Sequence, residues 1–137
     1  MLPIYDNGYA RSEYDEANQV VILHLGGMVN VEKTKDVFQK TMKFMETHHT
    51  TAVIYNGESL TGTFTQLNDY IAKEVSPFYD KQGVKYAITA LSMDVFTRFA
   101  VNSLLKMLKT NREVKIVRTF GEAKAYLEAK MNVKLSC

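Results

Sequence analysis

Segments typical of β-strands alternate along this chain with segments typical of α-helices. The strand-like segments are short, apolar and rich in β-branched residues, whereas the helix-like segments repeat apolar residues at three and four positions. A chain of this kind folds into a layered α/β domain, in which helices cover a mostly parallel sheet through right-handed crossovers. We expect strands at residues 9–15, 20–26, 51–55, 86–91 and 114–117.

The first two strands follow each other without a helix between them. Residues 9–15 alternate loosely between apolar and polar side chains, and residues 20–26 are almost entirely apolar. The turn-prone connection at residues 15–18 is short, so we expect a hairpin in which residues 9–15 form an edge strand and residues 20–26 are covered on both faces. The expected order is β-β-α-β-α-β-α-β-α, with a mixed, mostly parallel sheet packed with helices.

Polar capping residues mark the starts of helices. Asn30 is the expected N-cap of a helix that ends near Thr47, and Thr119 with Glu122 forms a capping box at the start of the last helix. Apolar residues form a wide stripe over residues 92–110, which predicts a helix that is apolar on more than one side.

The segment 55–70, YNGESLTGTFTQLNDY, is rich in hydroxyl groups. Thr63 and Gln66 have capping-box spacing, so we expect a helix to begin close to Thr63 after a polar loop. Ser76-Pro77 is expected to break or kink this helix, because proline has no backbone donor and clashes with the preceding turn. A short further helix would then run to Gly83, a residue type suited to a left-handed cap.

No catalytic arrangement accompanies these hydroxyl groups. A serine-hydrolase elbow requires Gly-x-Ser-x-Gly with a histidine downstream, but His24, His48 and His49 all precede the segment. A phosphate-binding loop requires a lysine after its glycines, and the stretch from Gly57 to Gly62 lacks it. We therefore expect no enzyme activity and no catalytic residue, and we interpret the segment as the capped start of a helix.

The three histidines and the single cysteine indicate no metal site and no cofactor. His24 lies within an apolar strand, where a hydrogen-bonded, half-buried side chain is expected. The adjacent His48 and His49 have no carboxylate at zinc-site spacing. Cys137 is the only cysteine, which excludes an intrachain disulfide and a thiolate cluster, and we expect it in a disordered tail.

Length and composition are those of one globular domain. A chain of 137 residues predicts a single domain over residues 1–137, with an ordered core at about residues 8–131. The longest unbroken aliphatic run, Val20–Leu23, is far shorter than a membrane span, and the N-terminus lacks a basic start followed by an apolar region. We expect a soluble cytoplasmic protein without a transmembrane segment.

Charge is distributed unevenly between the two parts of the chain. The net charge of +2 is too small to predict nucleic-acid binding. Residues 1–80 contain 6 Lys and Arg against 11 Asp and Glu, whereas residues 81–137 contain 11 against 4. The basic side chains form either a functional basic face or an ordinary solvated surface. The centre of this predicted basic patch is Lys106, Lys109, Arg112, Lys115 and Arg118.

Aromatic side chains are concentrated in two consecutive helical segments. A domain of this size cannot bury all of them, so we expect an apolar groove or a dimer face between these helices. The candidate residues are Phe64, Phe78, Tyr79, Phe96 and Phe99.

The order of elements and several local motifs resemble the SpoIIAA-like (STAS-like) superfamily, and within it bacterial proteins related to both STAS and CRAL-TRIO domains. The resemblance covers nearly the whole chain and implies an antiparallel edge hairpin joined to a mixed sheet, helices packed on it, and no catalytic machinery. The motifs are the hairpin 9–26, Gly27-Met-Val-Asn30, the strand 52–55 with its polar loop, Ser76-Pro77, the strand 86–91, Met93-Asp94-Val-Phe96, the strand 114–117 and Thr119-Phe-Gly-Glu-Ala123.

The resemblance also implies a site of phosphorylation. In the anti-sigma factor antagonists of this superfamily, the loop after the third strand carries a phosphorylatable serine, commonly within Asp-Ser-Ser-Gly. This chain has Asn56-Gly-Glu-Ser59 there, so the motif is absent. Ser59, Thr61 and Thr63 are the candidate phospho-acceptors in the corresponding region. A phosphate on Thr63 would be stabilised by the start of the helix.

Two functions stay open at this point. The first is a non-enzymatic regulatory or interaction module that binds a protein partner, or a second copy of itself, through residues 63–83 and 92–110. The second, from the likeness to CRAL-TRIO domains, is a carrier or sensor of an apolar, lipid-like small molecule with an acidic head. Arg98 and Lys106 are the candidate contacts to that head group.

Overall fold

The computed structural model describes residues 1–63, 65–91 and 95–137, and the side chains of residues 95–99 lie outside this description. The strands form a six-stranded sheet in chain order. The first three strands pair antiparallel, and β3 to β6 pair parallel, as the predicted mixed sheet requires. The strands are β1 (Leu2–Asp6), β2 (Ala10–Asp15), β3 (Val20–Met28), β4 (Ala52–Thr61), β5 (Tyr86–Leu91) and β6 (Glu113–Val117).

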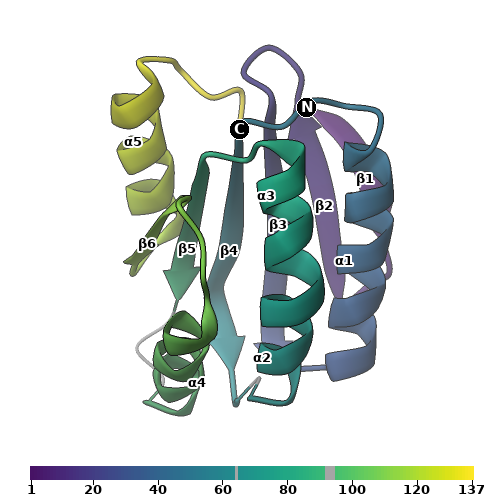
Figure 1. The fold of residues 1–137 in the computed structure, drawn as a ribbon, viewed down its shortest axis with the longest axis vertical. Coiled ribbons are helices and arrows are strands. Elements are labelled where there is room, and N and C mark those ends of the chain that lie inside the picture. The colour runs from purple at the N-terminus through teal and green to yellow at the C-terminus, as the bar shows by residue number, and fades with distance from the viewer. Residues whose placement is uncertain (64, 92–94) are drawn as a thin grey trace.

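Helices cover both faces of the sheet. α1 and the helix formed by α2, η1 and α3 stand side by side across one face (Figure 1). α4 packs against α2, and α5 packs on the opposite face of the sheet. None of the described helices is long and apolar enough to cross a membrane. The helices are α1 (Val31–Met45), α2 (Thr65–Tyr70), the π-helix η1 (Ile71–Val75), α3 (Ser76–Gln82), α4 (Val95–Met107) and α5 (Phe120–Met131).

Strand alternation divides the core between the two faces. Val21 and Leu23 of β3 point to the α1 side, whereas Val20 and Ile22 point to the α5 side, and all four are fully buried. This is the pattern expected of a parallel strand that is covered on both faces. The first core cluster, against α1 and α3, also contains Val37, Phe38 and Tyr79, and the second core cluster, against α5, contains Ile54, Ile88 and Leu127.

Local capping signals in the sequence are confirmed. The Asn30 side chain accepts a hydrogen bond from the Lys33 N–H at 3.0 Å, and α1 begins at the next residue. Thr119 Oγ1 accepts from the Glu122 N–H at 3.1 Å, as the predicted capping box requires. These signals are readable from the sequence because each cap involves residues only three positions apart.

The edge of the sheet differs from the prediction. β1 has no counterpart among the predicted strands, and it, rather than β2, forms the edge. Pro3 explains why the segment is hard to recognise, because proline cannot donate to a sheet and is tolerated mainly in edge strands. The register of β1 against β2 also shifts between Pro3 and Tyr5.

β4 is much longer than predicted. The strand expected at residues 51–55 continues to Thr61, so most of the predicted polar loop is strand. Its second half extends past its last described pair with β5, Gly57 with Leu91, and among the described residues it pairs only with β3. Ser59, for example, lies opposite Gly26. Because one side of this extension is not covered by a neighbouring strand, it tolerates polar residues that read as a loop.

The chain stays helical through Ser76-Pro77, and the short helix predicted to run from there to Gly83 is present as α3. Ser76 has helical dihedral angles, φ −62° and ψ −45°, and its N–H donates to the carbonyl of Ile71. This five-residue step is a π turn directly before the proline. The wider turn accommodates the proline ring, so the helix runs on to Gly83, which adopts the predicted left-handed conformation with φ 79°.

The C-terminal residues are docked on the sheet, in contrast to the predicted disordered tail. Leu135 is buried in the second core cluster, and the Ser136 N–H donates to the Asp15 carboxylate at 2.8 Å. Cys137 packs against the same cluster, and burial raises the pKa of its thiol. The tail is held because a buried leucine and backbone hydrogen bonds compensate for its ordering.

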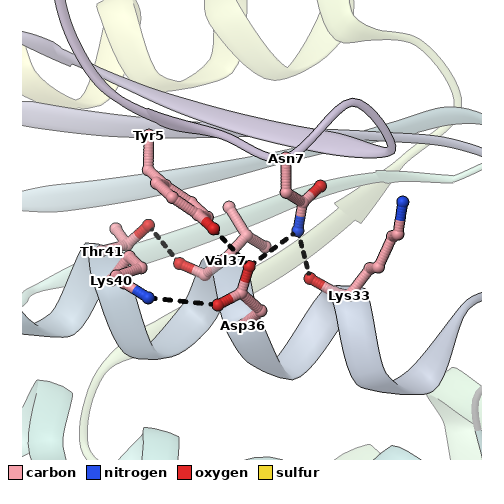
Figure 2. A network of polar contacts seen from close by, with 7 residues as sticks. All are labelled: Tyr5, Asn7, Lys33, Asp36, Val37, Lys40 and Thr41. Carbon is pink, nitrogen blue, oxygen red and sulfur yellow. Dashed lines mark hydrogen bonds and ion pairs between the residues drawn. The ribbon is translucent and has the colours of Figure 1, made fainter.

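A polar network ties β1 to α1 (Figure 2). Tyr5 donates to Asp36 Oδ2 at 2.6 Å, and Asn7 Nδ2 donates to the same oxygen at 3.2 Å and to the Lys33 carbonyl at 2.9 Å. Lys40 Nζ lies 3.3 Å from Asp36 Oδ1. Hydrogen bonds to its ionised form, that of Tyr5 above all, lower the pKa of Asp36 below its ordinary value.

Asp36→Asn is therefore expected to loosen β1. Since the folded state depresses the pKa of Asp36, its stabilising effect is present above the ordinary value of 3.8 and is lost as the pH falls through the folded pKa. Amide hydrogen exchange of β1 should be faster in the variant at pH 6 than in the parent protein, and the difference should shrink at pH 3. Glu32→Gln, at an acidic residue in the first turn of the same helix, is the matched control. Equal protection of β1 in both proteins at pH 6 would show that the network does not hold the strand.

Candidate functional site

An apolar cavity lies between the sheet and the helices of one face. Its volume is about 100 Å³, and its walls come from β3 to β6, from the helix α2–η1–α3 and from α4. Leu25, Leu91 and Ile116 contribute from the sheet, and Leu67, Ile71 and Leu104 contribute from the helices. A residue-by-residue search of the sequence cannot find such a cavity, because its walls are separated by up to about 90 residues of chain.

Two small residues line the cavity from the sheet. Gly57 of β4 has no side chain, and Ala87 of β5 has only a methyl group. A Cβ atom on Gly57 would lie 3.1 Å from the Ala90 carbonyl oxygen and 3.3 Å from Leu91 Cδ2, so this position is also closely packed against β5. Both residues therefore add little side-chain volume to the cavity wall.

One end of the cavity is polar and contains a buried arginine. The Arg112 side chain is only 3% exposed, whereas the side chain of its partner, Asp80, is 41% exposed, and Arg112 NH1 lies 2.8 Å from Asp80 Oδ1. Arg112 NH2 donates to Ser76 Oγ at 2.7 Å, and the guanidinium stacks over the Tyr79 ring at 5.4 Å. Among the residues that the structure describes, Nε of Arg112 has no hydrogen-bond partner.

Two tyrosines complete this polar end. The Tyr55 hydroxyl donates to the Tyr79 hydroxyl at 2.5 Å. Burial raises the pKa of Tyr55 well above its ordinary value and raises the pKa of Tyr79 to about 12. Both phenols therefore stay protonated near neutral pH, so the polar end contains one cation and neutral hydroxyl groups, and the carboxylate paired with that cation, Asp80, does not line the cavity.

The structure places only some of the aromatic residues that were predicted to form a groove. Tyr79 lines the cavity, whereas Phe78 packs, partly buried, against the first core cluster. Phe64 and the side chains of Phe96 and Phe99 lie outside the described part of the structure. The groove as predicted therefore stays a prediction, although its two helical segments do enclose the cavity.

The charged residue that lines the described cavity is Arg112, which is neither of the two expected head-group contacts. Lys106 is exposed and is not among the lining residues, and the Arg98 side chain lies outside the described part. Arg112, placed by the sequence in a basic surface patch, is instead buried beside the cavity, while Lys109, Lys115 and Arg118 of that patch are exposed. No sequence signal marks Arg112, because its partners Ser76 and Asp80 lie 36 and 32 residues away.

The candidate phospho-acceptors are all exposed. Ser59 and Thr61 belong to β4 rather than to a loop. Thr63 follows the strand, and its hydroxyl oxygen accepts from the Thr65 N–H at 3.3 Å, at the first residue of α2. Phosphorylation at these residues stays a prediction.

His24 has the hydrogen-bonded, half-buried environment that the sequence predicts. Its Nε2 lies 2.9 Å from Glu13 Oε1, its Nδ1 lies 3.0 Å from Asn56 Nδ2, and its ring meets Phe120 edge-on. This cluster lies on the α5 side of the sheet, away from the cavity. In the described ranges, no three His, Cys, Asp or Glu side chains are grouped as metal ligands would be.

Comparisons with known proteins address the fold. The sequence matches no protein-family model and no curated protein. A solved structure described as the anti-sigma factor antagonist SpoIIAA in its unphosphorylated form is similar, with a TM-score of 0.62 and 14% sequence identity, over 88% of this chain and 96% of that chain. The mixed sheet, the hairpin of β2 and β3 and the helices packed on the sheet are the features that the sequence resemblance implied. The chain therefore has the SpoIIAA-like (STAS-like) fold.

Proposed function

We propose that this chain is a non-enzymatic STAS-like regulatory module that binds a small apolar molecule in the cavity between its sheet and its helices. The observation that carries the proposal is the cavity itself, which is apolar along its walls and has a buried polar end at Arg112. Ligand sites in proteins commonly combine apolar walls with a few convergent polar groups.

The size of the cavity limits the ligand. An engineered apolar cavity of about 150 Å³ binds benzene or xenon. The cavity here is of the same order, at about 100 Å³, and so suits a compact molecule with few heavy atoms rather than a long-chain lipid. This size argument narrows the lipid-like ligand of the original hypothesis to a small one.

The chemistry of the polar end favours binding over catalysis. Its hydroxyl groups belong to Ser76, Tyr55 and Tyr79, and among the described residues no histidine lies at the cavity to act as a base. Ser76 Oγ already accepts from Arg112, and both tyrosines are protonated. A nucleophile beside a positioned base is therefore lacking in the described part of the cavity.

A hydrocarbon probe tests the proposal. Methylenecyclopentane is expected to bind saturably, to shift the methyl resonances of Leu67, Leu91 and Leu104, and to raise the melting temperature by mass action. Val101→Phe places a larger side chain in the cavity wall and should abolish these shifts.

Val133→Phe, in contact with the second core cluster, is the matched control and should leave probe binding unchanged. Both variants are first compared with the parent protein by their amide spectra, so that loss of binding is not confused with loss of folding. Absence of saturable shifts in the parent protein would contradict the proposed function.

A second candidate function is association with a protein partner or with a second copy of the chain. Leu105 and Met107, in the last turn of α4, are 37% and 39% exposed, within the helical segment that the sequence predicts as an interface. The structural relative is described as an anti-sigma factor antagonist, a role that involves a protein partner. Sedimentation of the parent protein and of Met107→Asp, at an exposed residue that does not line the cavity, would test self-association, since only the parent should form a dimer.

A further inference from the structure

We propose that the ligand of the cavity is an uncharged molecule with one hydrogen-bond acceptor, such as a small ketone, and that the acceptor pairs with Nε–H of Arg112. This inference rests on the proposed function and specifies the chemical class of its ligand. It differs from the acidic head group that the sequence suggests.

The first support is the unequal use of the guanidinium donors. NH1 donates to Asp80 at 2.8 Å and lies 3.4 Å from the Ser76 carbonyl oxygen, and NH2 donates to Ser76 Oγ at 2.7 Å. Nε is buried and has no partner among the described residues. A buried donor without a partner costs free energy, and a bound acceptor oxygen would remove that cost. Arg112 is among the residues that line the cavity, which places its side chain within reach of a ligand there.

The second support is the charge balance of the polar end. Asp80 already neutralises Arg112 through a direct ion pair. A ligand carboxylate would add a second anion to a site with one cation, and its desolvation would not be compensated by a free counter-charge. A neutral acceptor satisfies Nε–H without this cost.

The neighbouring groups do not supply another cation. Tyr55 and Tyr79 are neutral phenols paired with each other, and Ser76 is already an acceptor for the guanidinium. Lys106, the exposed lysine on α4, does not line the cavity. The polar end therefore favours a ligand that accepts a hydrogen bond over a ligand that carries a charge.

Three probes that share a five-membered ring separate these alternatives. The protein is titrated with cyclopentanone, with methylenecyclopentane, in which a CH₂ group replaces the ketone oxygen, and with cyclopentanecarboxylate. Binding is followed by the methyl resonances of the cavity and by the Nε–H resonance of Arg112. We expect the ketone to bind about tenfold more tightly than the hydrocarbon, and to be alone in moving the Nε–H resonance downfield.

The outcomes distinguish this inference from the proposed function. Equal binding of ketone and hydrocarbon, with the Nε–H resonance unmoved, would overturn the role of Arg112 and leave the apolar cavity in place. Tighter binding of the carboxylate would overturn the preference for an uncharged ligand. Failure of all three probes to bind would overturn the proposed function, and the inference with it.

Discussion

Arg112→Ala is expected to lower the free energy of unfolding by about 3 kcal/mol. The side chain is 3% exposed and joins the start of β6 to α3 through Ser76 and Asp80. Its removal leaves a gap beside Tyr79 and takes away the hydrogen bonds to both partners. Denaturant unfolding, monitored by far-UV circular dichroism, measures the change, which corresponds to a fall of roughly 10 °C in the melting temperature.

Arg118→Ala is the matched control for this variant. Arg118 belongs to the same basic segment of the sequence but is exposed, so its removal should change the free energy of unfolding by less than about 0.5 kcal/mol. Asp80→Asn separates the charge from the packing, because it keeps the side-chain size while leaving the buried cation without its counter-ion. If Arg112→Ala and Arg118→Ala were equally mild, the guanidinium would be solvated in solution, and the polar end described above would be wrong.

Leu127→Ala is also expected to lower the free energy of unfolding by about 3 kcal/mol. Leu127 of α5 is fully buried in the second core cluster against Ile54 and Ile88. Among the described helices, α5 is the one that covers this face of the sheet, so no second helix can move in to fill the space left by the lost methyl groups. Thermal and denaturant unfolding of the variant measure the loss.

The control for Leu127→Ala lies on the exposed side of the same helix. Ala129→Ser changes helix propensity slightly but removes no buried group, and should cost less than about 0.7 kcal/mol. A small loss for Leu127→Ala would mean that α5 is only loosely docked. In that case the docking of the C-terminal residues, which share the cluster through Leu135, would be in doubt as well.

Several features of the fold were predictable because they depend on neighbours in sequence. The strand at residues 86–91 and the caps at Asn30 and Thr119 are readable from periodicity and from side chains within a few positions. The mostly parallel sheet follows in turn, since strands that alternate with helices along the chain are typical of parallel pairing.

Other features depend on contacts between distant segments. The second half of β4 reads as a loop, and it becomes strand only because β3 lies beside it with Gly26 and Met28 in register. Tertiary pairing thus overrides the local preference of these residues.

The sequence by itself determined the layered α/β class and the hairpin of residues 9–26, because hydrophobic period and capping are local properties. Only the tertiary structure decided that Arg112 is buried, that it meets Ser76 and Asp80, and that an apolar cavity ends at its side chain. From the sequence alone, a basic residue in a basic segment is predicted to lie on the surface. The burial of Arg112 depends on partners that lie more than 30 residues away in the sequence. A local sequence pattern therefore cannot predict it.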